Sequence, residues 1–172
     1  MRPIYSQKLL AIFEQRLGAW TPSFSPIKVR SDRLFPGERV FHHDHRDASI
    51  YLVWRPDPKM KQSFTIEYGW ARKGSFPNLL ALRCPVPTAS RVEFALTELY
   101  QNVSAFARAP LWWPIEEMGT SASQIKHHFA KADIPDAVAT ERVREASDRA
   151  FHWLEENLLP YLREYVSFLD RE

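Results

Sequence analysis

Residues 49–71 read SIYLVWRPDPKMKQSFTIEYGWA, and this stretch decides the fold. Its first seven residues are mostly apolar on both faces of an extended chain, which is typical of a strand inside a sheet. In its last nine residues apolar side chains alternate with others and should face the core together: Phe64, Ile66, Tyr68 and Trp70. The polar link between these runs contains two prolines and is too short for a parallel crossover, so we predict an antiparallel hairpin.

The segments before this hairpin extend the pattern. A helix is predicted from a cap at Ser6 to a stop at Gly18, because Leu9, Phe13 and Leu17 recur at helical spacing. Residues 27–30 and 38–45 alternate as strands do, and residues 78–84 could add one more strand.

The segments after Pro87 return to helical spacing. A capping box at residues 90–93, a short helical pattern at 121–132 and a long one from about Asp136 follow in order, and Pro160 should split the last. We therefore expect an α+β fold in which one antiparallel sheet of three to five strands packs against an N-terminal helix and C-terminal helices.

Chain length and composition fit one soluble domain over residues 1–172, with the sheet in residues 1–87 and a helical part in residues 88–172. The chain is 45% hydrophobic and has only 5 glycines, and no glycine-rich phosphate loop occurs in it. We expect no cofactor and no membrane partner, since no long apolar run exists. The single cysteine, Cys84, makes an internal disulfide impossible, and a cytoplasmic location is expected.

Charge is distributed unevenly along the chain. Residues 1–90 carry 14 basic and 7 acidic side chains, whereas residues 91–172 carry 9 and 14. This polarity could steer a charged partner, or the two halves could neutralise each other within one chain or between chains. We favour neutralisation within the molecule.

A histidine cluster lies in the strand at residues 38–45. If this strand is extended, His43 and His45 share one face and His42 and Asp44 share the other. A metal-dependent hydrolase could use His43 and His45, with Asp47 as a further candidate ligand, but no established metal motif accompanies them. We prefer the alternative of a polar edge strand whose charges discourage pairing with other chains.

No catalytic residue can be named from the sequence. Glu67 lies in an otherwise apolar strand, so it is either half-buried with a cationic partner such as Arg55 or solvated and paired across the hairpin. We prefer the solvated position, and we likewise expect Glu116 to be solvated. No nucleophile elbow marks a serine hydrolase.

Nucleic-acid binding is a third possibility. Near the two ends of the hairpin, among aromatic residues, lie four basic residues, as in proteins that bind single strands: Lys59, Lys61, Arg72 and Lys73. The aromatic residues, however, alternate into the predicted core, where they could not stack on bases. The acidic C-terminal half would also repel a polyanion.

The strongest candidate for recognition is PLWWPIEE at residues 110–117. Tryptophan is enriched at binding hot spots, and of two adjacent tryptophans between prolines one can be buried while the other is exposed. The predicted binding residues are those of this connector and of the polar ends of the sheet: Trp112, Trp113, His42, Asp44, Arg72 and Lys73.

The order of these features resembles a family of small bacterial α+β proteins of unknown function. The similarity covers roughly residues 5–75 and includes FTIEYG at residues 64–69, which is similar to an F-T-x-x-x-G strand ending. Some proteins of that type look toxin-neutralising or defence-associated, and the resemblance supplies no catalytic residue. We expect a non-enzymatic protein-binding module of an immunity-like kind, with the hydrolase and the single-stranded nucleic-acid-binding protein as alternatives.

Overall fold

The structure is a computed structural model, and it describes residues 1–29, 34–46, 48–57, 62–72, 84–85, 111–116, 133–160, 162–163 and 166. Within these ranges the side chains of residues 48, 70–72, 84 and 85 are not described. Predictions that concern other residues, including the capping box at 90–93 and the helical pattern at 121–132, lie outside the described residues.

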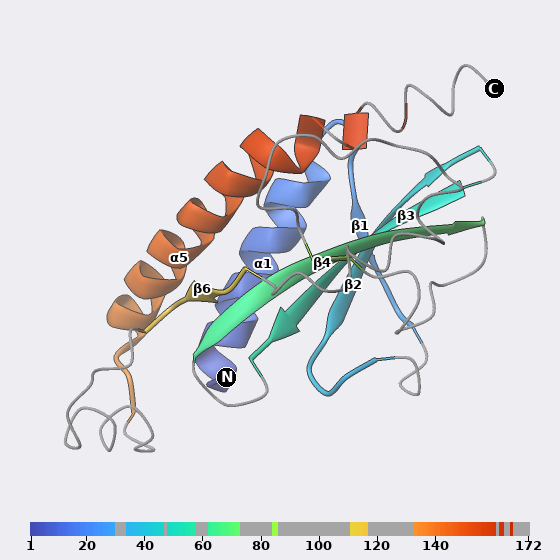
Figure 1. The fold of residues 1–172 in the computed structure, drawn as a ribbon. Coiled ribbons are helices and arrows are strands. Elements are labelled where there is room, and N and C mark those ends of the chain that lie inside the picture. Colours follow the sequence, from blue (N-terminus) through green and yellow to red (C-terminus); the bar gives the residue numbers. More distant parts are fainter. Residues whose placement is uncertain are drawn as a thin grey trace.

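One antiparallel sheet and two helices form the described fold (Figure 1). The elements in chain order are α1 (Pro3–Gly18), β1 (Ser25–Ile27), β2 (Arg39–His45), β3 (Ala48–Pro56), β4 (Ser63–Arg72), β5 (Cys84–Pro85), β6 (Trp113–Pro114) and α5 (Asp136–Asn157). The spatial order is β1-β2-β3-β4-β5, and β6 also pairs with β4. The predicted α+β class is confirmed.

The central hairpin has the predicted pairing. β3 and β4 are antiparallel, with Trp54 opposite Ile66 and Leu52 opposite Tyr68. β3 lies in the middle of the sheet and is buried on both faces, as its continuous apolar pattern indicates. Phe64, Ile66 and Tyr68 face the main core, while Trp70 is among the residues whose side chains are not described.

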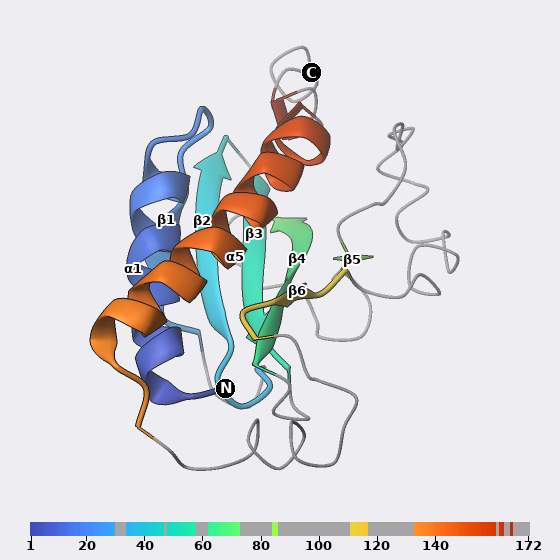
Figure 2. The same ribbon diagram turned by 90° about the vertical axis from the view of Figure 1, so that its left-hand side faces the viewer.

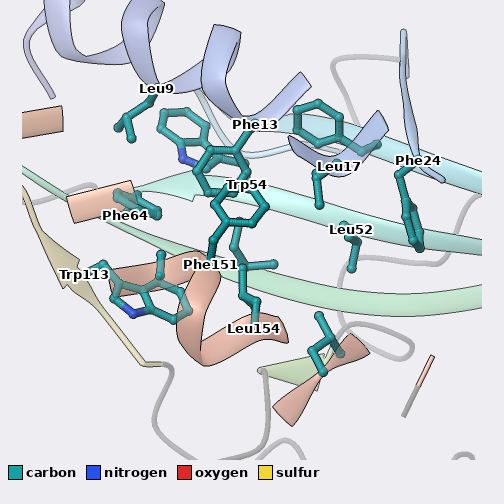
Figure 3. Packing of buried hydrophobic residues seen from close by; sticks show 14 of the residues in the cluster. Leu9, Phe13, Leu17, Phe24, Leu52, Trp54, Phe64, Trp113, Phe151 and Leu154 are labelled. Atoms are coloured by element: carbon teal, nitrogen blue, oxygen red, sulfur yellow. The ribbon is translucent and has the colours of Figure 1, made fainter. Parts of the chain in front are cut away.

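Both helices cover the same face of the sheet and lie side by side across it (Figure 2). The core between the layers is aromatic, and Phe13 of α1 lies at its centre (Figure 3). The Phe13 ring centroid is 5.6 Å from that of Phe64 and 4.8 Å from that of Phe151 on α5. Phe13 therefore connects α1 both to the sheet and to α5.

The opposite face of the sheet is also covered. Val40, Tyr51 and Val53 are each at most 5% exposed and form a second apolar cluster with Ile27, Val29 and Leu34. Polar residues on this face, such as Thr65 and Glu67, are therefore buried as well. This second layer sets the surroundings of the candidate site.

The helix boundaries correct one prediction and agree with another. α1 begins at Pro3, which occupies the first helical position, where its missing N–H costs nothing, so Ser6 is not the cap. α5 begins at Asp136 as expected and ends at Asn157, before Pro160. Residues 159–160 and 162–163 are helical again, which agrees with the predicted division near Pro160.

Two strand predictions also need correction. The first strand is Ser25–Ile27 rather than residues 27–30, and Pro26 is tolerated there because β1 lies at the edge of the described sheet. β2 is not an edge strand, since β1 pairs with its residues Val40 to His42. Of the predicted strand at 78–84, the structure describes only Cys84.

Ion pairs connect the basic and acidic parts of the chain. Lys8 Nζ lies 2.8 Å from Asp136 Oδ1, and Arg16 pairs with Asp148 at 2.8 Å and with Glu155 at 3.3 Å. Part of the uneven charge is therefore neutralised between α1 and α5. In the part of the chain that the structure describes, no helix combines the length and apolar character needed to cross a membrane.

Candidate functional site

A cavity of about 670 Å³ lies where the start of α1 meets the end of β3. This volume is within the range of about 300–1,000 Å³ that is usual for ligand pockets. The lining comes from α1, from the turn before β2 and from the ends of β2 and β3: Met1, Ser6, Leu10, Phe35, Pro36, Gly37, Arg39, Trp54, Arg55, Pro56 and Asp57.

The turn at residues 35–38 forms one wall of this cavity and is held in place by Glu38. The backbone N–H of Phe35 donates to Glu38 Oε2 at 2.9 Å, and the N–H of Glu38 donates to the Phe35 carbonyl at 3.1 Å. Gly37 has a φ of 85°, and a Cβ there would lie 3.0 Å from Cγ of Pro56. Glycine thus permits both the turn and its close contact with β3, and the wall is preorganised.

Arg55 lies between two aromatic rings beside the cavity. Its guanidinium carbon is 5.7 Å from the centroid of Phe35 and 5.6 Å from that of Trp112, distances at which cation–π attraction operates. Nη1 of Arg55 donates to Glu67 Oε1 at 2.6 Å. We call Phe35, Arg55, Trp112 and Glu67 the Arg55 clamp.

The clamp overturns the expectation that Glu67 is solvated. Glu67 is 8% exposed, and the cationic partner that the sequence suggested, Arg55, is the residue that it pairs with. Burial is possible because the charge of Arg55 compensates that of the carboxylate.

Trp54 and Arg39 give the cavity its chemical character. Trp54 lines the cavity although it is only 1% exposed, and its Nε1 is closed off from solvent and has no hydrogen-bond partner among the described residues. Arg39 is exposed, its Nη1 donates to the Glu38 carbonyl at 2.8 Å, and no carboxylate of the described residues contacts it.

A polar network holds the segment that carries Trp112. The Tyr5 hydroxyl donates to the Glu116 carboxylate, and Arg142 Nη1 lies 2.7 Å from Glu116 Oε1 and 3.0 Å from the Tyr5 oxygen. Burial, and after it the hydrogen bond to Glu116, raises the pKa of Tyr5, so the phenol stays protonated near neutral pH. The network ties residues 111–116 to α1 and α5.

The Glu116 contacts correct a second expectation. Its side chain is only 11% exposed, although the sequence favoured a solvated residue. The partners that bury it come from α1 and α5, which are distant in the chain.

The histidine-rich strand has the predicted alternation. The rings of His43 and His45 stack with centroids 6.1 Å apart on one face, and His42 Nδ1 lies 3.5 Å from Asp44 Oδ1 on the other. Nδ1 of His43 is 3.0 Å from the Ser23 carbonyl, so this nitrogen carries the proton and donates. Burial lowers the pKa of His43.

The same strand bears on the hypothesis of a metal site. Among the residues that the structure describes, no three His, Cys, Asp or Glu side chains gather in a group that could hold a metal ion. His43 Nε2 is closed off from solvent, and no group in the described part of the chain forms a hydrogen bond with it. Asp47 lies outside the described residues.

The two tryptophans of the connector have different environments. Trp113 is 6% exposed and packs in the core against Phe64 and Trp153, with centroid distances of 5.7 Å and 6.2 Å. Trp112 is partly exposed and contacts Arg55.

The other predicted binding residues lie elsewhere. His42 stacks on Tyr51, and Asp44 accepts a hydrogen bond from Ser49 Oγ at 2.5 Å, both farther along β2 than the cavity. Arg72 pairs through its backbone with Ala48 in the sheet, but its side chain and the whole of Lys73 lie outside the description.

Sequence reasoning missed Phe35 and Arg39. The available signal was FPGER at residues 35–39, an aromatic residue before a Pro-Gly turn followed by a basic residue. Nothing local in that signal shows that the turn contacts β3 and α1.

Comparisons of the chain with models of protein families, with curated proteins and with solved structures found no match.

Proposed function

We propose that this chain is a non-enzymatic binding module that recognises a partner protein through the cavity and the Arg55 clamp. The observation that carries the proposal is the position of the Arg55 guanidinium between Phe35 and Trp112 beside a cavity of about 670 Å³. Arginine and tryptophan dominate binding hot spots, and such residues lie around well-packed pockets. Phe35 is 50% exposed, so an aromatic surface is available to a partner.

The ionisable side chains of the cavity favour binding over catalysis. Arg39 and Arg55 present guanidinium groups, which donate hydrogen bonds and have no acceptor atom. The carboxylate of Asp57 accepts a hydrogen bond from Ser63 Oγ at 3.2 Å. These groups can orient a ligand.

The alternative functions have weaker support. A hydrolase centred on His43 and His45 would need ligands beyond the two stacked rings, and Nδ1 of His43 already donates to the Ser23 carbonyl. Two of the rings that the sequence suggested for stacking on nucleic-acid bases, Trp54 and Tyr68, are only 1% and 3% exposed. Residues 5–75 resemble small bacterial α+β proteins of unknown function, some of which look toxin-neutralising or defence-associated, and on this ground the proposal includes a toxin-like partner protein.

Photo-crosslinking in cells that carry this gene tests the proposal. The photoreactive residue p-benzoylphenylalanine would replace Phe35 in one variant and Val138 in a control, since both are exposed apolar positions. We expect one defined protein to be crosslinked from position 35 and not from position 138. Trp112→Ala, added to the position 35 variant, should remove most of that product.

The opposite result is also defined. Equal crosslinking from both positions, or none from position 35, would contradict recognition at this site. Circular dichroism of each variant would show whether the fold is kept.

A further inference from the structure

We propose that the cavity takes an acidic apolar peptide segment of the partner protein, with an apolar side chain inside and a neighbouring carboxylate on Arg39. This inference rests on the proposed function and adds the chemistry of the ligand to it. The juxtaposition that carries it is an apolar cavity with one arginine on its wall that contacts no carboxylate of the described residues.

The interior of the cavity is suited to an apolar group. Most of its lining is apolar: Met1, Leu10, Phe35, Pro36, Trp54 and Pro56. An apolar side chain of the partner that packs against these residues leaves water, and the gain in free energy is proportional to the apolar area buried. The turn at residues 35–38 is held by Glu38 and packs against Pro56, so little ordering is needed on binding.

The charges on the wall select an acidic neighbour. Arg55 is already paired with Glu67, and Asp57 accepts from Ser63, whereas the Arg39 guanidinium donates to a backbone carbonyl and pairs with no carboxylate of the described residues. A guanidinium has five N–H donors, so Arg39 retains donors for a second acceptor. A carboxylate matches this fork in charge and in geometry.

A peptide fits better than a free small acid because aromatic surface continues beyond the cavity. Phe35 is 50% exposed, and Trp112, which also contacts Arg55, is partly exposed. A small acid enclosed in the cavity would leave Trp112, which is not part of the lining, without contact. A segment that continues over the Arg55 clamp would cover both rings.

Titrations of the purified full chain with blocked peptides test this ligand chemistry. The probes are acetyl-Gly-Phe-Asp-Gly-amide and its Asn counterpart, which differ only in one negative charge, and binding is followed by NMR shifts of the tryptophan indole N–H signals. Charge-assisted hydrogen bonds predict about tenfold tighter binding of the Asp peptide. Arg39→Ala should remove this preference, whereas Arg144→Ala, an exposed control on α5, should keep it.

Four results would overturn the inference. Three of them are equal affinity for the Asp and Asn peptides, an unchanged preference in Arg39→Ala, and absence of binding by either peptide at millimolar concentration. The fourth is binding of N-acetylphenylalanine as tight as that of the Asp peptide, which would assign the cavity to a small acid instead. In each case the crosslink from position 35 still decides whether a partner protein is bound, so the two proposals can fail separately.

Discussion

The buried ion pair of the Arg55 clamp permits a quantitative test by a double-mutant cycle. The variants are Arg55→Met, Glu67→Gln and the two combined. Nη1 of Arg55 lies 2.6 Å from Oε1 of Glu67, and the side chains are 23% and 11% exposed. Each single variant leaves the other group without its partner in a mostly buried place.

The expected size follows from this burial. Removing one partner of a fully buried pair costs about 3–5 kcal/mol in the free energy of unfolding. Water still reaches part of Arg55 and screens the charges. We therefore expect Glu67→Gln to lower the free energy of unfolding by about 2–3 kcal/mol, less than for a fully buried pair. Arg55→Met should cost about 3 kcal/mol, because Glu67 is more deeply buried and the contacts with two rings are lost. The double variant should lose about 2 kcal/mol less than the sum of the two.

Urea unfolding at pH 7, followed by tryptophan fluorescence, measures all four free energies. A control cycle uses Arg144→Met and Glu141→Gln, whose ion pair has the same 2.6 Å separation but side chains 62% and 54% exposed. That surface pair should couple by at most about 0.5 kcal/mol. If the two cycles gave the same coupling, burial would not control the energy of the clamp and our reasoning would be refuted.

Three further variants probe the core, the polar network and a histidine. Phe13→Ala should lower the free energy of unfolding by about 3–5 kcal/mol, against less than about 0.5 kcal/mol for the surface control Val138→Ala, as measured in urea; equal losses would contradict the central position of Phe13. Tyr5→Phe should cost about 1–2 kcal/mol by the same measurement, because the buried carboxylate of Glu116 loses one of its donors, and an unchanged free energy of unfolding would show that this hydrogen bond does not stabilise the fold. The pKa of His43 is lowered in the folded chain, so the unfolded chain binds a proton at this residue more readily. The contribution of neutral His43 to the free energy of unfolding is therefore complete above the ordinary pKa of 6.5 and is lost as the pH falls below that value. Between pH 7.5 and 5.5 the free energy of unfolding in urea should therefore fall less in His43→Gln than in the unaltered chain. An equal fall in both would show that His43 does not cause this pH dependence.

Local patterns determined much of the fold in advance. The alternation of Phe64, Ile66 and Tyr68 identified the inward face of β4, and the short link in residues 56–62 required antiparallel pairing. The long helix from Asp136 was likewise readable from its helical spacing. Each of these features depends on residues close in the chain, where backbone geometry fixes which side chains share a face.

The candidate site depended on contacts between distant segments. Whether Glu67 is solvated or buried depends on what covers the second face of the sheet, and the cavity exists because the turn at 35–38 meets β3 and α1. Trp112 reaches Arg55 from 57 positions away in the chain. The sequence by itself therefore determined the elements and their inward faces, because periodicity is local. Only the tertiary structure decided which polar residues are buried together, because burial is a property of the assembled layers.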